Sequence, residues 1–589
     1  MPHLIAISIG PVQDFIAAAR KTRDLWYGSA MLSEVSRHVA QTLQEQHGAE
    51  LIFPNPSAVR ASGDGRPAVA NKILASLSDA DPRNAARDAR DAAIRWLVER
   101  YEESLNRLGD ARQYIDEEIA SRQVKHALEF YSAWTPFDPD QDDYPARRER
   151  VERLLAGRKA LRNFLKADGK AGVPKSSLDP GRESVLRPDS DDAVAALSTR
   201  LNLPRRTLRD GQIRLSEHLD GISLIKRVGG AQGGQARFPS VVRVAVDPYI
   251  RKLRQRDPST LQRLYALAQE AADRGFIERL PEEGVNTAPY QEFPFDSQML
   301  FADDPDIPSD DPNGARIKSE VAQLVGHRVP THYAVLVADG DRMGEYLGTL
   351  TSADAHRQFS SRLEEFARQA GETVRGHRGV LVYSGGDDVL AFLPVDLALA
   401  CADQLRRDFK RIAGEDLNLS AGLSASYYRD PLWLALERGR AALQAAKQVR
   451  NALAVAWHTR SGGSTPNAVV SSWSDNPVTE WMRWIERFAR DEVPSGALYE
   501  LRSLAREYRP LFQPGRAGET PGDLIEQEVR RVLGRKRTAG GSRTLGDLVI
   551  DEIATRSRSP EQLEALVDWL IVARRFAEIL PSTTQEATA

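Results

Sequence analysis

The chain lacks several features that would assign it to a specialised class. It has a single cysteine, Cys401, in 589 residues, which excludes an internal disulfide and any zinc site built from several cysteines. Cys401 lies in an apolar pattern with helical spacing, so we interpret it as a core residue. No apolar run reaches the roughly 18 residues that span a bilayer, and the N-terminus leads into a predicted strand without a cleavable leader. We therefore expect a cytoplasmic protein with no membrane partner.

The chain also has almost no net charge. Its 80 Lys and Arg residues nearly balance 83 Asp and Glu residues, which gives a formal charge of -3 at pH 7. Without a global basic field, any nucleic-acid site must be a local patch. The arginine-rich residues 144–166 could contact RNA phosphates, although a solvated helix face is the simpler interpretation.

Two short apolar strands, each followed by a turn and a helix, indicate two similar units. Residues 4–9 (LIAISI) end at Gly10, and residues 333–338 (YAVLVA) end at Asp339. The second unit continues as helix, strand pair, helix and strand, which is the β-α-β-β-α-β order of a ferredoxin-like palm domain. Because the first unit has glycine where the second has aspartate, only the second predicts acidic ligands.

We predict an α+β protein with two ferredoxin-like palm domains, a helical insertion and a helical C-terminal domain. The expected division is 1–77 and 210–300 for the first palm domain, 78–209 for the insertion, 301–318 for a linker, 319–472 for the second palm domain and 473–589 for the C-terminal domain. The glycine-rich residues 227–240 match no phosphate-binding fingerprint, so they are interpreted as a loop that could close over a ligand or simply be mobile.

The strand pair of the second unit meets at the turn Gly385-Gly386-Asp387-Asp388. Glycine and aspartate are common in turns, so the motif alone could be turn chemistry. In the ferredoxin-like topology, however, the end of the first strand faces this hairpin and brings Asp339 toward both aspartates. Clustered carboxylates repel one another unless cations compensate them, and hard oxygen ligands suit Mg²⁺ or Mn²⁺. The sequence thus predicts a two-metal site for an in-line attack at phosphorus.

Residues next to this site are candidates for binding a triphosphate. The turn from Gly340 to Gly344 follows a strand and precedes a helix, where backbone N–H groups can point at phosphates. Within it, Asp341 and Arg342 could instead only shape the turn. Lys447 ends a helix expected to pack near the same sheet, so its ammonium could neutralise phosphates or could simply be solvated.

Several motifs together resemble the large, polymerase-like subunit of type III CRISPR effector complexes, in the III-B or Cmr branch. They are spread from residue 4 to about 460 and comprise SIGPVQDFIAAARKTRDLWYGSAMLS (8–33), LIFPNP (51–56), LDGISLIKR (219–227), RFPSVVRVA (237–245), VADGDRMGEYLG (337–348) and YSGGDDVLAFLP (383–394). The resemblance implies that the second palm domain converts ATP into cyclic oligoadenylates when target RNA pairs with a CRISPR RNA. It also implies two partner subunits, one that binds the guide 5′ tag and one that is small and helical.

The resemblance also assigns individual roles. Asp339, Asp387 and Asp388 match its metal-binding carboxylates. Its nucleotide-contacting positions fall on Gly340, Asp341, Arg342, Met343, Gly344, Ser384, Gly385, Gly386 and Lys447.

The chain departs from the family pattern in two ways. None of its ten histidines is followed by aspartate, and the first palm pattern starts at residue 4, so we expect no HD nuclease activity. One cysteine cannot form the family's four-cysteine site, so we expect no structural zinc. Two alternatives share these motifs: the same site could join ATP to S-adenosylmethionine, or the chain could be a non-catalytic scaffold that binds nucleotide.

Overall fold

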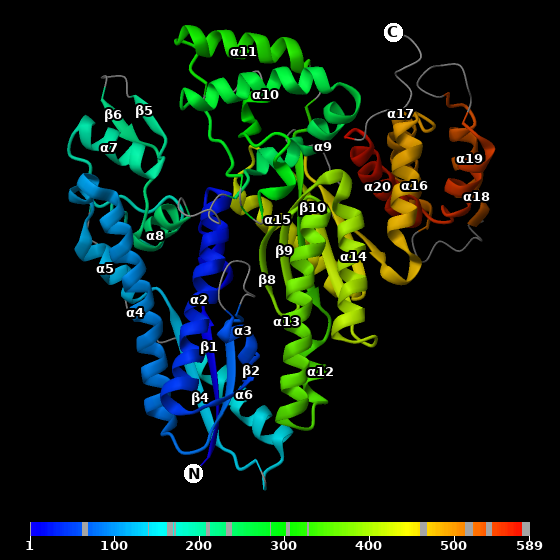
Figure 1. Cartoon of the computed structure of the whole chain (residues 1–589). Helices are drawn as coiled ribbons and strands as arrows, with labels where there is room; N and C mark the ends of the chain where they lie inside the picture. Colours follow the sequence, from blue (N-terminus) through cyan, green and yellow to red (C-terminus); the bar gives the residue numbers. More distant parts are fainter. Residues whose placement is uncertain are drawn as a thin grey trace.

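Two sheets covered by helices organise the computed structural model of the chain (Figure 1). The structure describes residues 2–579, apart from 62–68, 140, 162–168, 170–171, 208–211, 231–237, 283, 285, 302–306, 327–328, 460–467, 513–521 and 538–544. Half of the predicted glycine-rich loop, part of the predicted linker and the polar C-terminal tail therefore lie outside the described residues. Across the described part of the chain, no helix is both long and apolar enough to cross a bilayer.

The first sheet is a ferredoxin-like palm near the N-terminus. In spatial order its antiparallel strands are β2 (Glu50–Phe53), β3 (Lys72–Leu77), β1 (His3–Gly10) and β4 (Glu129–Pro136). Alternation along β1 sorts its side chains between two cores. Ile5 and Ile7 join the core with α2 (Thr22–His47) and α4 (Pro82–Leu108), whereas Leu4 and Ala6 pack with α6 (Tyr144–Ala160) on the other face.

The predicted boundaries of the first palm domain are wrong at two places. Strand β4 falls within residues 78–209, predicted as a helical insertion, yet it pairs with β1 over eight residues. Residues 210–300 contribute no described strand to this sheet, and their helix α9 (Val241–Arg256) packs on β7 and β9 of the second sheet instead. The reason is topological: helices α4 and α5 (Glu117–Lys125) form the second crossover, so the sheet completes its four strands by residue 136.

Most of the segments between the two sheets are helical. They contain α7 (Asp191–Leu201), α8 (Gly221–Gly229), α10 (Pro258–Asp273), α11 (Pro312–Val325) and a hairpin of β5 (Arg205–Thr207) and β6 (Ile213–Leu215). Buried Arg227 of α8 bonds Asp24 at 2.7 Å and Glu217 at 2.6 Å, which anchors α8 to α2. The predicted linker 301–318 is partly helical, because Asp311 caps α11 by accepting N–H bonds from Asn313 and Gly314.

The second sheet carries the predicted acidic motif. Its spatial order is β12 (Val469–Ser472), β11 (Ala452–Trp457), β10 (Leu419–Tyr427), β7 (His332–Gly340), β9 (Asp388–Pro394) and β8 (Val380–Gly385). The four strands from β10 to β8 have the ferredoxin-like order, and β11 adds a parallel strand beside β10. The predicted α+β class with two palm domains is confirmed.

Helices cover both faces of this sheet and bring α15 to the end that holds the acidic residues. Helices α13 (Ala353–Gly376) and α14 (Val395–Ala413) pack on one face, and α15 (Leu432–Val449) and α9 pack on the other. At Gly422 of β10 the backbone of α15 is so close that a Cβ would overlap the main chain at Leu443. Since α15 runs back along β10, its last turn, with Lys447, lies beside the end of β7.

The two palm domains pack against each other reciprocally. Helix α2 of the first contacts β8 of the second, and α13 of the second contacts β2 of the first. On the α13 side, the Arg357 Nε donates to Leu51 O at 3.1 Å and Ser57 Oγ donates to Glu364 at 3.1 Å. A further hydrogen bond of 2.7 Å joins Tyr144 of α6 to His356 of α13. The domains are thus fixed relative to each other by α2, α6 and α13.

The C-terminal region is helical, as predicted. Its helices are α16 (Pro477–Ala489), α17 (Ser495–Tyr508), α18 (Gly522–Leu533), α19 (Asp547–Thr555) and α20 (Pro560–Ala577). Trp481 and Trp484 are fully buried and pack with Trp569 of α20. Phe576 of α20 meets Trp457 of β11 at 5.4 Å between ring centroids, which joins this region to the second sheet.

Candidate metal and nucleotide site

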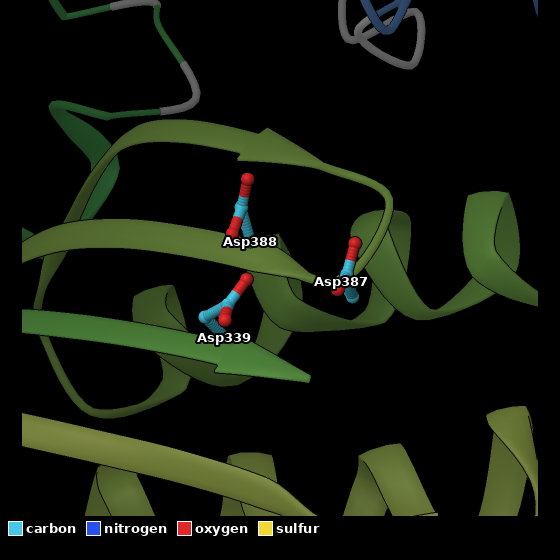
Figure 2. Close-up of side chains that lie close together, drawn as sticks. All are labelled: Asp339, Asp387 and Asp388. Atoms are coloured by element: carbon cyan, nitrogen blue, oxygen red, sulfur yellow. The ribbon is translucent and has the colours of Figure 1, made fainter. Parts of the chain in front are cut away.

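Three aspartates, one from β7 and two from the β8–β9 hairpin, meet at one end of the second sheet. Asp339 is the penultimate residue of β7, Asp387 lies in the turn between β8 and β9, and Asp388 begins β9. Antiparallel pairing of Ala338 with Val389 brings Asp339 across from Asp388. One carboxylate oxygen of each residue lies within 4.8 Å of the others, and Figure 2 shows the three side chains close together at the end of the sheet. The predicted convergence of Asp339 on the hairpin is therefore seen in the structure.

The two glycines of the turn are required by its geometry. Gly386 has φ +79°, a left-handed conformation that side chains with a Cβ rarely adopt. At Gly385 a Cβ would overlap the Tyr383 ring. Both glycines therefore shape the hairpin so that Asp387 and Asp388 reach Asp339.

The site is electrostatically unfavourable for three ionised carboxylates. Burial, reinforced by the charge of Asp339, raises the pKa of Asp387 to about 7. Desolvation, a hydrogen bond with Asp339 and the charge of Asp387 also raise the pKa of Asp388, although this residue is the most exposed of the three. A hard divalent cation favours such a group of crowded carboxylates, because its charge stabilises their ionised form and their oxygens are the ligands it prefers. The residues present thus fit Mg²⁺ or Mn²⁺.

Lys447 supplies the nearest fixed positive charge. Its Nζ donates to Gly340 O at 2.6 Å and pairs with Asp339 and, at 3.3 Å, with Asp341 Oδ1. The side chain is 20% exposed, so the interpretation of Lys447 as a solvated helix end is wrong. Its charge lowers the pKa values of Asp387 and Asp388 and partly offsets their mutual repulsion.

The predicted turn residues occupy different surroundings. Gly340 touches the site directly, since a Cβ there would lie 2.9 Å from Asp387 Oδ2 and 2.8 Å from Met343 Sδ. Met343 opens the short helix α12 (Met343–Gly348), and Gly344 behind it faces open space. Arg342 is exposed, with φ +55° and a loose ion pair to Glu345 at 3.7 Å.

Ser384 and Asp341 are both buried near the acidic residues, but they differ in their partners. The buried Ser384 hydroxyl has no hydrogen-bond partner among the described residues. Asp341 has partners on both oxygens: Ser420 Oγ lies 2.8 and 2.9 Å from them, and the Asn451 backbone N–H donates to Oδ2 at 2.7 Å. No sequence signal pointed to Ser420 or Asn451, because neither belongs to a motif and both reach the site only through the tertiary fold.

A ferredoxin-like sheet with acidic residues at its strand end and hairpin turn defines a palm-domain protein of the polymerase and cyclase type. The family model of the Cas10/Cmr2 second palm domain matches residues 332–454, and that of the CRISPR-associated protein Cmr2 N-terminal domain matches residues 4–106. Two segments of the chain therefore match domain models of the Cas10/Cmr2 family, and the predicted resemblance to the large subunit of the Cmr branch is confirmed.

Similar proteins agree with this assignment. The Cmr subunit Cmr2 of Pyrococcus furiosus is 24% identical over 557 residues, an alignment that covers 78% of this chain and 62% of the relative. The chain thus spans under two thirds of the length of that curated relative.

Solved structures show the shared fold. The apo state of a type III-B Cmr-beta complex has a chain with TM-score 0.65 and 14% identity, covering 93% of this chain and 78% of that chain. The same type of complex bound to cognate target RNA gives TM-score 0.62 at 13% identity, with coverages of 92% and 79%. A Csm1–Csm4 cassette in complex with cA4 gives TM-score 0.50 at 15% identity, with coverages of 98% and 70%.

Proposed function

We propose that this chain is the large subunit of a type III-B CRISPR RNA-guided effector complex, and that its second palm domain converts ATP into cyclic oligoadenylates when target RNA binds. The observation that carries the proposal is the convergence of Asp339, Asp387 and Asp388 within 4.8 Å. A scaffold would gain nothing from three carboxylates whose proximity raises the pKa values of two of them. The cA4 ligand of the similar Csm1–Csm4 cassette supports the same product class.

The chemistry assigns a role to each part of the site. Asp339, Asp387 and Asp388 would hold two divalent ions, Mg²⁺ or Mn²⁺, which when bound lower the pKa of an attacking hydroxyl and stabilise a leaving pyrophosphate. Lys447 provides a point charge for the β and γ phosphates from its place beside Gly340. The free hydroxyl of Ser384 can donate to the nucleotide at the turn.

The proposed partners are the CRISPR RNA, the target RNA and neighbouring Cmr subunits, including the one that binds the guide 5′ tag and the small helical one. The solved III-B complex with cognate target RNA, which shares this fold, supports them.

The test uses the assembled complex with guide RNA. ATP is added with Mg²⁺ or Mn²⁺, with and without matching target RNA and S-adenosylmethionine, and products are identified by mass spectrometry. We expect cyclic oligoadenylates only when target RNA is present, and none from the variant Asp387→Asn/Asp388→Asn. The variant of the exposed Asp416, Asp416→Asn, serves as the matched control.

Each other outcome has a defined meaning. A product that contains S-adenosylmethionine would support the proposed metal site but show that S-adenosylmethionine is the acceptor. The absence of any nucleotide product would refute an enzymatic role, and full turnover by the double variant would refute the assignment of the metal ligands.

A further inference from the structure

Asp341 differs from the three aspartates beside it, although it lies only two residues after Asp339. Its side chain is 6% exposed and does not belong to the group whose oxygens converge. Both of its oxygens have partners inside the protein: the Ser420 hydroxyl, which has one hydrogen to donate, lies 2.8 and 2.9 Å from them, and the Asn451 N–H donates to Oδ2 at 2.7 Å. Both oxygens of Asp341 are therefore already engaged within the protein, and neither belongs to the converging group.

Asp341 instead holds Lys447. The ammonium has three N–H donors, and the structure gives it three acceptors: Gly340 O, Asp339 and Asp341 Oδ1. An ammonium held by one hydrogen bond and two ion pairs has a fixed place, whereas a lysine with one partner can rotate about its flexible stem. Since Asp339 is also a candidate metal ligand, Asp341 is the carboxylate that, among the described partners of Lys447, can keep the ammonium in place when Asp339 is engaged.

The same carboxylate joins two parts of the chain. Asn451, whose N–H it accepts, follows α15 with φ +43°, and its carbonyl accepts the N–H of Trp473 at 2.9 Å. Trp473 is buried and donates its Nε1 to Leu419 O, next to Ser420, at 2.9 Å. The position of Asp341 is thus fixed by the end of α15, by β10 and by the first residues of the C-terminal region.

We infer that Asp341 is a positioning residue: it is not a ligand of metal or nucleotide, but holds the Lys447 ammonium beside the three converging aspartates. The inference rests on the proposed function, because it explains how the Lys447 ammonium is placed where it would meet the triphosphate. It changes the role expected from the sequence resemblance, in which Asp341 contacts the nucleotide.

The first test measures the environment of Lys447 without metal, nucleotide or turnover. The full chain is acetylated with N-hydroxysuccinimidyl acetate, and the rate at Lys447 is followed by mass spectrometry. In Asp341→Asn the ammonium loses a charged partner, so we expect acetylation to rise at least about threefold. The control is Asp408→Asn. Asp408 lies in α14, is also buried, and accepts a hydrogen bond from the Thr373 hydroxyl at 2.7 Å. An unchanged rate in Asp341→Asn overturns the inference.

The second test separates positioning from simple charge. Mn²⁺ affinity is measured for Asp341→Asn in the wild-type chain and in Lys447→Met. If Asp341 acts through Lys447, affinity falls about tenfold in the wild-type background and changes little in Lys447→Met. An equal fall in both backgrounds means that Asp341 acts on the cation directly, which overturns the inference.

The two tests also separate this inference from the proposed function. A wild-type chain that binds no Mn²⁺ would refute the proposed metal site, while the acetylation rates would still decide the role of Asp341. Should Asp341→Asn fail to fold, Ser420→Ala loosens Asp341 without removing its charge. Faster acetylation of Lys447 in that variant is expected, and an unchanged rate overturns the inference.

Discussion

Replacing Asp387 with asparagine should stabilise the metal-free protein. Burial and the charge of Asp339 raise the Asp387 pKa from 3.8 to about 7. At pH 7 a shift of this size corresponds to at most about 4 kcal/mol of destabilisation, since each unit is worth about 1.36 kcal/mol. Solvent that reaches the open end of the sheet screens part of this, so we expect Asp387→Asn to raise the free energy of unfolding by about 1–3 kcal/mol.

The pH dependence has a definite sign. The folded-state pKa of Asp387 lies above its unfolded value, so between pH 4 and 7 the folded chain binds more protons than the unfolded chain. This carboxyl therefore makes the wild-type protein less stable as pH rises through that window. The advantage of Asp387→Asn should accordingly be largest near pH 7 and small near pH 4.

Thermal or urea unfolding in EDTA, at pH 7 and pH 5, measures the effect, with Asp416→Asn as the surface control. Saturating Mn²⁺ should reverse the order, because a ligand at 100 times its Kd stabilises the wild-type fold by about 2.7 kcal/mol, whereas Asp387→Asn weakens that binding. Equal or lower stability of Asp387→Asn in EDTA at pH 7 would refute the electrostatic account of the site.

Three further predictions concern the frame of the site. Gly386→Ala places a Cβ on a residue with φ +79°, so it should lower the free energy of unfolding by about 1–2 kcal/mol and abolish turnover. Gly157→Ala, where a Cβ would meet open space, should do neither. Urea unfolding and product assays compare the two variants. Gly422→Ala pushes α15 from the sheet and should cost about 1–3 kcal/mol in the same unfolding assay, and unchanged stability would contradict the close approach. Burial lowers the pKa of His356 to about 4 from 6.5, so the folded state resists its protonation and stability is lost as pH falls below 6.5. This amounts to about 2 kcal/mol at pH 5, and His356→Gln should show a correspondingly flatter pH dependence of unfolding.

The second palm domain was the most predictable part of the fold. Its strands and helices follow one another with short connections, so local periodicity locates β7, α13, α14 and α15 and the hairpin around Asp387. The first palm domain has the same topology, but its second crossover is made by α4, a 3-10 turn and α5 before β4 begins at Glu129. When a strand is separated from its sheet by such a long helical segment, the local sequence does not indicate which sheet the strand joins. The predicted end of this part of the first palm domain at residue 77 therefore came too early.

The residues of the site divide in the same way. The sequence by itself determined the chemistry. It places one aspartate at the end of a β-strand and two aspartates in a turn whose glycines suit its backbone conformation, and it places a lysine at the end of a helix. The tertiary structure alone decided the partners. Long-range pairing of β7 with β9 and β10 places Asp339 against Asp388, while Asp341 lies against Ser420 and Asn451 and outside the group of three converging carboxylates. Two aspartates separated by one glycine look equivalent in the sequence. Their roles differ because the Ser420 hydroxyl and the Asn451 N–H, 79 and 110 residues away along the chain, donate to Asp341.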